Sequence, residues 1–458
     1  MTAGSAASLV EVLGAHVARL GWEALPPEVV RMARRCLLDT LGCALLGTAT
    51  PEAAALVAAA RDLGPDGPCT IWGTGRRAPA PVAALVNGTH AHLRELDDIG
   101  GGGHAGACQV PAVLAAAELA GADGRAVLLG LVAGHEVSSR LTDAASYEAM
   151  TLAGWHTTGL YGSLGATAAA ARTLGLDART TAHALGLCAS YTGGVWAFMA
   201  DGAMSKRVHP GRSAETAVVA AVLARRGVTG PLHALEATWG GLFSTCLPGQ
   251  AKPEAILDSL GDGFRILRKG FKVYPTCWGI ASAADAVLGL RARHALVAAD
   301  VVRVRITLSE MSRRMIGGRR IDSLLDAQMS VAWSVACILA RGRLTLEEFT
   351  ETALRDPAIR GLMDRIELVV DPAAHGERQT VEIETRDGRR LLDRVETPRG
   401  HWDNPLTDAE LRAKFLALAT PVLGGAASEV ADLVDEVDRP GALDRLLERL
   451  RRGVSPPR

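Results

Sequence analysis

Residues 206–226 read KRVHPGRSAETAVVAAVLARR, a cluster of three cations and a histidine that runs into an alanine-rich segment. Alanine and leucine favour the helix, and small side chains let helices pack closely. Pro210 and the glycines on either side predict a shaped loop that leads into a helix over 213–226. Unpaired amides at a helix start and nearby cations suit a carboxylate or a phosphate. The alternative is a solvated basic loop, the more common outcome for a short run of charge.

The composition excludes several classes of protein. The chain has 458 residues, 48% of them hydrophobic, enough for a sizeable core and roughly two or three domains. A net charge of −1 gives no support for a nucleic-acid partner. Eight scattered cysteines without a C-x-x-C pair argue against a zinc ribbon or a disulfide scaffold and favour a reducing cytoplasm. The sequence also predicts no signal peptide and no membrane span, since it lacks the apolar segments that either requires.

The first 270 residues predict an almost entirely helical domain, which the segment 400–458 completes. Apolar residues recur at helical spacing, and proline stands at the start of the second helix, where it is tolerated. The predicted helices span 6–22, 27–47, 51–62, 79–93, 110–121, 125–142, 158–174, 179–193 and 213–226.

Residues 271–399 predict a smaller α+β domain. Apolar and polar residues alternate over 301–308, which is typical of a half-buried strand. Similar runs and a hairpin turn at Asp387-Gly388 follow, and helices are interspersed. The predicted strands are 301–308, 366–370, 379–385 and 390–395, and the helices 280–292, 326–339 and 346–354. The fold class is therefore mainly α, with a tail after Arg451 that we expect to be disordered.

Two histidines stand where proton transfer is plausible. His156 follows Gly154-Trp155 near a predicted helix start, where it can act as a general acid or base or simply cap the helix. His104 follows four consecutive glycines, with Glu95, Asp97 and Asp98 upstream. Such a loop lets a ligand approach the backbone, although a flexible surface connection explains it equally well.

A lysine and a tyrosine mark the junction of the two predicted domains. Lys272-Val273-Tyr274-Pro275-Thr276-Cys277 lies where clefts often bind ligands, so Lys272 could hold a carboxylate or be a solvated hinge residue. Cys277 lacks the features of an activated thiol. Metal binding is not expected, because His90 and His92 are spaced to point to different sides of a helix.

The order of several short motifs resembles the MmgE/PrpD family, which includes 2-methylcitrate dehydratase, cis-aconitate decarboxylase and iminodisuccinate epimerase. The likeness covers almost the whole chain. Its motifs are Cys36 to Gly42, Asn87-Gly88, Leu96-Asp97-Asp98 with His104, Gly154-Trp155-His156, Lys206 to Gly211, Lys272 to Cys277 and Pro398 to His401.

The resemblance implies a large all-helical domain and a smaller α+β lid, usually in a homodimer, without metal or organic cofactor. A cleft between the domains would take a di- or tricarboxylic acid. Positions carried over from the family as catalytic are His156, His104, Lys206, Lys272 and Glu95. Positions expected to help bind the substrate are Arg207, His209, Arg212, Asp98 and Tyr274.

Three positions depart from the family pattern. Glu95 stands where the lyases commonly have an aspartate, and Ala281 replaces a frequent histidine. The loop from Asp98 to His104 is also shorter than in the decarboxylase. These departures affect the reaction more than the fold.

The leading function is a lyase that removes water or carbon dioxide from a polycarboxylate. His156 would move the proton, His104 would assist, and Lys206 with Lys272 would stabilise negative charge beside a carboxylate. An isomerase or epimerase on the same scaffold is the first alternative, because Ala281 removes one candidate leaving-group acid. A non-catalytic carboxylate-binding member is the second.

Overall fold

The computed structural model describes residues 7–452, which form two compact units. The helical unit comprises the chain up to Trp196, Ser205–Gly270 and the chain from Thr407 onward. The mixed unit comprises Ala197–Met204 and Phe271–Leu406. The tail expected to be disordered after Arg451 lies almost wholly outside the described residues.

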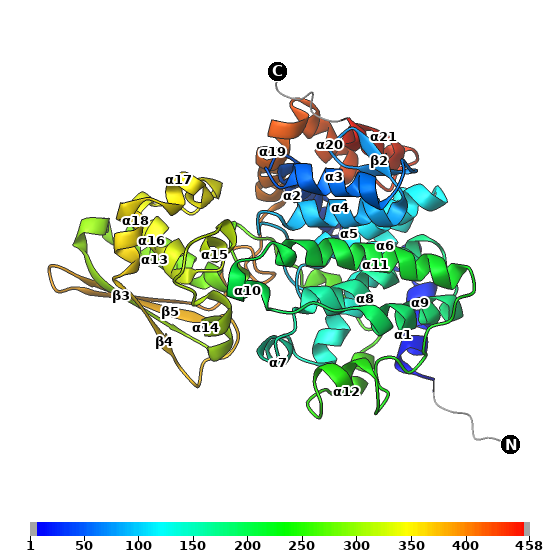
Figure 1. Cartoon of the computed structure of the whole chain (residues 1–458), viewed down its shortest axis with the longest axis horizontal. Coiled ribbons are helices and arrows are strands. Elements are labelled where there is room, and N and C mark those ends of the chain that lie inside the picture. The colour runs from blue at the N-terminus through cyan, green and yellow to red at the C-terminus, as the bar shows by residue number, and fades with distance from the viewer. Residues whose placement is uncertain (1–6, 453–458) are drawn as a thin grey trace. The chain divides into compact units, whose positions relative to one another are not determined.

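The helical unit is a stack of helices with one short hairpin, seen from blue to green and again in orange and red in Figure 1. Helix α11 packs against α4, α5, α8 and α9 and forms the centre of the unit. The hairpin of β1 (Cys69–Ile71) and β2 (Arg76–Ala78) lies between the predicted helices 51–62 and 79–93, where no strand was predicted. The α-helices are α1 (Leu9–Arg19), α2 (Pro27–Thr48), α3 (Ala53–Leu63), α4 (Ala80–His92), α5 (Ala105–Ala120), α6 (Gly124–Ala144), α7 (Tyr147–Leu152), α8 (Thr157–Thr173), α9 (Ala178–Tyr191), α11 (Ser205–Arg225), α12 (Leu242–Cys246), α19 (Asp408–Leu423), α20 (Ala426–Asp435) and α21 (Ala442–Arg451).

The predicted loop over 206–212 is wrong, because α11 already begins at Ser205 and includes Pro210. The proline removes a single backbone donor near the start of a 21-residue helix. Gly211 has a packing role instead: it faces Gly88 of α4, and a Cβ on Gly88 would lie 2.8 Å from the Cα of Gly211. A Cβ on Gly211 would collide with the carbonyl of Leu85. The glycines therefore allow two helices to cross at close range.

The mixed unit contains a four-stranded sheet in the order β4-β3-β5-β6. Strands β3 and β4 are parallel, and the other neighbours are antiparallel. All four predicted strands are confirmed: β3 (Val301–Leu308), β4 (Ile366–Val370), β5 (Gln379–Thr385) and β6 (Arg390–Val395). The helices are α10 (Phe198–Asp201), α13 (Ala281–His294), α14 (Glu310–Ile316), α15 (Leu324–Gln328), α16 (Val331–Arg341), α17 (Glu351–Leu354) and α18 (Pro357–Met363). The prediction of a mainly α fold with a smaller α+β part is confirmed.

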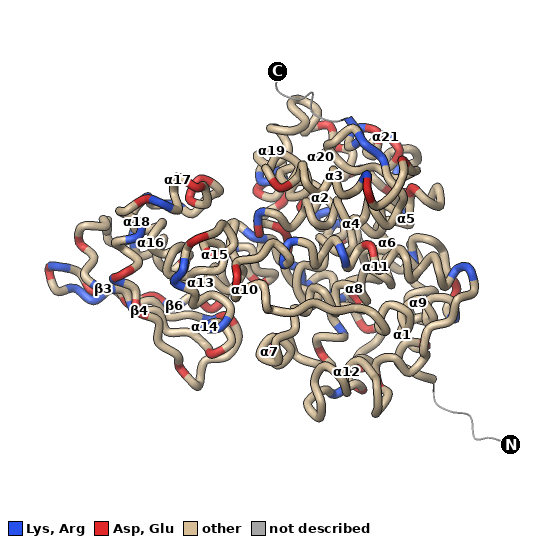
Figure 2. The backbone as a smooth tube through the Cα atoms, in the orientation of Figure 1, with Lys and Arg blue, Asp and Glu red and all other residues tan. Residues whose placement is uncertain are grey.

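Positions of Lys and Arg and positions of Asp and Glu are interspersed along the backbone of each unit (Figure 2). Within residues 7–452, no single helix is long and apolar enough to cross a membrane. Helices α2 and α3 pass that test only as a pair joined across a 96° bend. All eight cysteines are buried.

Candidate active site

Two histidines cap neighbouring helices of the helical unit. His104 is the N-cap residue of α5 and His156 that of α8, as predicted for His156. The backbone amide of His104 donates to the hydroxyl of Thr158 at 3.3 Å, and that of His156 donates to the carbonyl of Gly194 at 2.9 Å. The two ring centroids are 6.4 Å apart. Residues 52 apart in sequence thus meet because two helices begin at the same place.

The glycine loop before His104 is buried and shaped. Asp97 and Asp98 are both 0% exposed, so the interpretation as a flexible surface connection is wrong. The four glycines 100–103 have φ values of 101°, 63°, 82° and 141°, all in the region that favours glycine. A Cβ on Gly102 would lie 2.8 Å from the ring of Tyr161. The glycines therefore allow the loop to turn tightly inside the core and to present His104.

Asp97 orients two imidazoles. Its Oδ1 lies 2.9 Å from Nδ1 of His92, and its Oδ2 lies 3.1 Å from Nδ1 of His104. Burial alone would raise the pKa of Asp97, but the two imidazoles outweigh burial and hold this pKa well below its ordinary value. A carboxylate only accepts, so both histidines carry a proton on Nδ1.

Lys206 and Arg207 of α11 converge on one buried carboxylate. Both donate to Oε1 of Glu95, which is 0% exposed. Lys206 also lies 2.9 Å from Nε2 of His92. Glu95 has a backbone φ of 53°, which is uncommon for a residue other than glycine. This conformation holds the carboxylate of Glu95 between the two cations. The predicted carboxylate clamp is therefore already charge-paired inside the helical unit.

His156 and His209 form a second imidazole pair. Their Nδ1 atoms are 2.8 Å apart, and Trp196 packs edge-on against His156 with centroids 5.4 Å apart. Burial first, and then the charge of Lys206, hold the pKa of His156 well below its ordinary value. The same two causes lower the pKa of His209 to about 4. Both rings are therefore neutral at pH 7, and one of the two Nδ1 atoms carries the shared proton.

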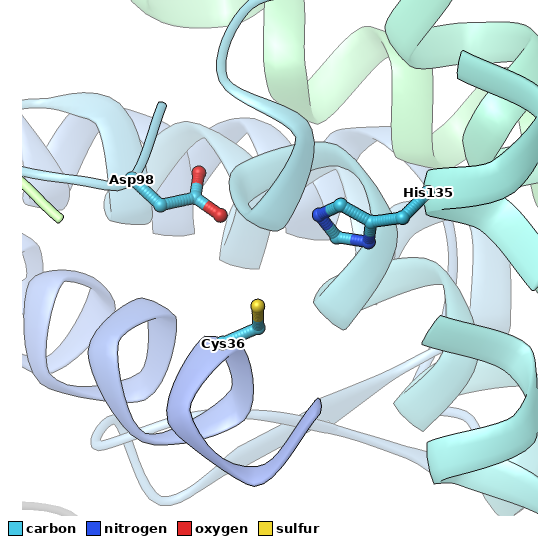
Figure 3. A group of neighbouring side chains, drawn as sticks. All are labelled: Cys36, Asp98 and His135. Atoms are coloured by element: carbon cyan, nitrogen blue, oxygen red, sulfur yellow. The ribbon is translucent and has the colours of Figure 1, made fainter. Parts of the chain in front are cut away.

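A further buried group lies behind the glycine loop, where Cys36, Asp98 and His135 point toward one another (Figure 3). Their ligand atoms lie within 4.8 Å of one another, and His92, Asp97 and His104 form another such group. Each group lies beside a lysine ammonium. Nζ of Lys269 is 2.6 Å from Oδ2 of Asp98 in the first group, and Nζ of Lys206 is 2.9 Å from Nε2 of His92 in the second. Lysine in this position supplies the positive charge that a metal ion would supply, so the donor sets fit an ammonium better than a metal.

Asp98 secures the loop and does not line the histidine cluster. Its carboxylate accepts from the amide of Gly106 at 3.0 Å and from Lys269, and its carbonyl oxygen lies 3.2 Å from Nδ1 of His104. Burial raises the pKa of Asp98 to about 6, although Lys269 acts in the opposite direction. These contacts support the loop and His104, and the role of Asp98 as a substrate ligand stays a prediction.

The structure does not bring every predicted residue to the cluster. Arg212 points to solvent with 60% of its side chain exposed and pairs with Glu215 at 2.6 Å. Lys272 and Tyr274 belong to the mixed unit, where the hydroxyl of Tyr274 donates to Asp285 at 2.5 Å. Their part in the site remains a prediction, as does the effect of Ala281, the first residue of α13.

Sequence reasoning missed three residues of these groups. His92, His135 and Lys269 are buried. His92 contacts Asp97 and Lys269 contacts Asp98, while Nδ1 of His135 lies 3.0 Å from the carbonyl of Leu131 in its own helix. For His92 a signal existed: its side chain faces Asp97 five residues later. Lys269 is recognisable only from its contact with Asp98, far away in the sequence.

A buried set of histidines, paired cations and carboxylates is typical of an enzyme that moves protons on an anionic substrate. The chain belongs to the MmgE/PrpD family: the N-terminal domain of that family matches residues 11–254, and the C-terminal domain matches residues 274–439. This confirms the resemblance drawn from the motifs.

Three relatives illustrate the range of similarity. A cis-aconitate decarboxylase-like protein, oryM, of Aspergillus oryzae is 29% identical, covering 87% of this chain and 88% of the relative. Human cis-aconitate decarboxylase is 28% identical, over 94% and 92%. A 2-methylcitrate dehydratase of Cupriavidus necator is 28% identical, over 74% and 73%.

Proposed function

We propose that this protein is a lyase that acts on a tricarboxylic acid by proton transfer beside a carboxylate, without a cofactor. The first candidate reaction is decarboxylation of cis-aconitate, and the second is dehydration of 2-methylcitrate. The observation that carries the proposal is the buried arrangement of His104 and His156 around the Lys206–Glu95 pair. Similarity to the decarboxylases over 87–96% of the chain, against 74–81% for the dehydratases, favours the first reaction.

Decarboxylation of cis-aconitate requires one proton for each carbon dioxide released. The carbon–carbon bond to a carboxylate breaks, and its electron pair spreads over the adjacent double bond and is then protonated on carbon. We assign this protonation to Nε2 of His156, since its Nδ1 is engaged with His209. Lys206 would stabilise the remaining carboxylates and the developing negative charge. A part for Lys272 stays a prediction from the family resemblance.

In a dehydration the same groups would work in a different order. One histidine would remove a proton from carbon while a second acid protonates the departing hydroxide. His104, whose Nδ1 is held by Asp97, is the candidate for that second acid. An epimerase would need only the proton removal and return, so it remains the alternative outcome of the assay below.

The assay is turnover in D₂O followed by proton NMR and mass spectrometry, with cis-aconitate, citrate, 2-methylcitrate and substituted succinates offered separately. Decarboxylation predicts loss of one carbon dioxide and gain of one carbon-bound deuterium per turnover. Dehydration predicts loss of water, and epimerisation predicts deuterium uptake without any loss. A His156→Asn variant should lose activity roughly 10²- to 10⁴-fold, whereas His294→Asn, an exposed histidine of the mixed unit, should not.

The proposal includes a homodimer, since the family resemblance implies one, and a cytoplasmic location, which eight scattered cysteines without a C-x-x-C pair favour. Sedimentation velocity at several concentrations tests the first. Cell fractionation tests the second. A monomer at micromolar concentration or a secreted protein would refute the respective part without affecting the lyase proposal.

A further inference from the structure

The histidines of the site differ in what their Nδ1 atoms face. Nδ1 of His92 and Nδ1 of His104 both face Asp97, which can only accept, so these two tautomers are fixed. Nδ1 of His156 faces Nδ1 of His209 instead. An imidazole nitrogen can accept or donate, and thus His156 has a partner that permits both tautomers.

We propose that His209 is a proton-relay partner of His156, so that the pair stores the proton that His156 exchanges with the substrate. This inference rests on the proposed function, because it assumes that His156 carries out the proton transfer. The 2.8 Å separation of the two Nδ1 atoms is a hydrogen-bond distance, and both rings are held by buried structure.

The relay balances in protons. At rest His156 carries a proton on Nδ1, and His209 carries one on Nε2 and accepts at Nδ1. When Nε2 of His156 takes a proton, its Nδ1 proton passes to Nδ1 of His209, and the positive charge moves to that ring. The reverse sequence delivers a proton from Nε2 of His156 to carbon, and His209 returns its proton to Nδ1 of His156. No oxidant, metal or additional group is needed.

The surroundings hold the two rings in line. His209 lies on α11, one turn after Lys206, and His156 is fixed by its backbone bond to Gly194. The loop that carries Gly194 also contacts the other ring, because a Cβ on Gly194 would lie 3.4 Å from Nδ1 of His209. Trp196, from the same loop, closes the edge of His156. One loop therefore positions both members of the pair.

Charged groups nearby explain why a stored proton would not stay on the pair without a substrate. The groups that act on His156 are Lys206 and His209 on α11, His104 before α5 and His92 on α4, and all of them lower its pKa. A bound polycarboxylate has the opposite sign and raises that pKa. The pair would thus take up its extra proton together with the substrate and release it with the product.

The first test measures the pair in the resting protein, without turnover. In protein with ¹⁵N-labelled histidine, protonated and bare ring nitrogens have well-separated shifts. We expect His156 and His209 to show complementary Nδ1 atoms, one protonated and one bare, or an averaged pair that exchanges the proton. His209→Asn should leave a single fixed tautomer at His156. Two bare or two protonated Nδ1 atoms in the wild-type protein at pH 7 would overturn the proposal.

The second test separates a relay from simple positioning. The amide of an asparagine can reach the position of Nδ1 and form the same hydrogen bond, but it cannot hold an extra proton. We expect His209→Ala and His209→Asn both to lower kcat about 10²-fold, with KM changed less than about threefold. The limb of the pH–rate profile that reports His156 should move to higher pH in both, because His209 lowers the pKa of His156.

A third variant serves as the matched control. His183→Asn changes another partly buried histidine of the helical unit, whose Nδ1 lies 3.1 Å from the carbonyl of Gly230. It should leave both kcat and the pH profile unchanged. Near-wild-type activity in His209→Asn would show positioning alone and overturn the relay. If the wild-type protein turns over none of the acids, the proposed function fails, while the NMR result still decides whether the pair shares its proton.

Discussion

Replacing Glu95 by glutamine tests whether the carboxylate of Glu95 neutralises the buried cations of α11. The side chain keeps its size but loses its charge, and Lys206 and Arg207 both lose their shared partner. Breaking a buried ion pair by neutralising one member costs about 3–5 kcal/mol, because the remaining charge is left uncompensated. Since the amide oxygen of glutamine can still accept one hydrogen bond, we expect about 3 kcal/mol.

Glu215→Gln is the matched control. Glu215 also lies on α11 and pairs with an arginine, Arg212, whose side chain is 60% exposed. The same chemical change should cost only about 0–1 kcal/mol there, since surface pairs contribute little. Urea titrations at pH 7, followed by circular dichroism with midpoint and slope fitted together, give both values. Equal losses in the two variants, within about 0.5 kcal/mol, would refute the assignment of a buried charge pair.

A ligand titration extends the same test. In the wild-type protein a carboxylate must compete with Glu95 for Lys206 and Arg207, whereas in Glu95→Gln the competing charge of Glu95 is gone. A hydrogen bond to a charged group contributes about 1.5–3 kcal/mol, so citrate should bind roughly 10- to 100-fold more tightly to the variant. Calorimetric titration measures the two dissociation constants. Weaker binding to the variant would show that Glu95 itself is needed to hold the anion site together.

Three further predictions concern stability. Burial lowers the pKa of His90 to about 4, so the unfolded chain takes up a proton below pH 6.5 that the folded chain refuses. The free energy of unfolding of the wild-type protein should therefore fall by up to about 3 kcal/mol through this group between pH 6.5 and pH 4. Urea titrations at several pH values measure this loss. His90→Leu should abolish that part of it, whereas the control His294→Leu should not. Gly211→Ala should lower the free energy of unfolding by about 2–4 kcal/mol, because its Cβ overlaps α4. Its control is Gly361→Ala in α18, where a Cβ meets nothing within 4 Å, and this change should be neutral or stabilising by about 0.5–1 kcal/mol. Equal unfolding midpoints in the two variants would contradict the packing argument. Dialysis against a chelator should leave the unfolding midpoint unchanged, and a fall in that midpoint would show that the Cys36 group holds a metal after all.

The fold could be predicted from local patterns with few errors. Alternation over 301–308 and the Asp387-Gly388 turn suffice for the sheet of the mixed unit, because period and turn chemistry are local properties. The loop predicted over 206–212 failed for the opposite reason. Pro210 and Gly211 favour a loop locally, but the close crossing of α4 and α11 keeps the segment helical, and that contact is not visible in the sequence of either helix alone.

The site was predictable only as far as helix starts reveal it. His156 was found because a histidine before a predicted helix is a local signal, and His104 because it follows four consecutive glycines. The charge balance of the site could not be predicted in this way. Glu95 and Lys206 are 111 residues apart, so the sequence suggested a lysine available to a ligand where the structure has a lysine paired with a glutamate. The same limit applies to Lys269, whose contact with Asp98 depends on the path of the whole chain.

The paired cations have a consequence for binding. Within the helical unit, Lys206 and Arg207 face Glu95, and the low pKa values of His156 and His209 keep both of these rings neutral at pH 7. A tricarboxylate placed beside this set adds negative charge in a region of low dielectric, and the least costly response is protonation of an imidazole. Binding should therefore take up about one proton at pH 7.

Calorimetric titration of citrate in two buffers with different ionisation enthalpies measures the number of protons taken up on binding. It should fall toward zero in Glu95→Gln, where Lys206 and Arg207 no longer face the charge of Glu95 and can balance the ligand, but remain in Glu215→Gln. Equal uptake in the wild-type protein and Glu95→Gln would mean that the histidines do not respond to the charge of the ligand, and the link between Glu95 and the imidazoles would have to be abandoned.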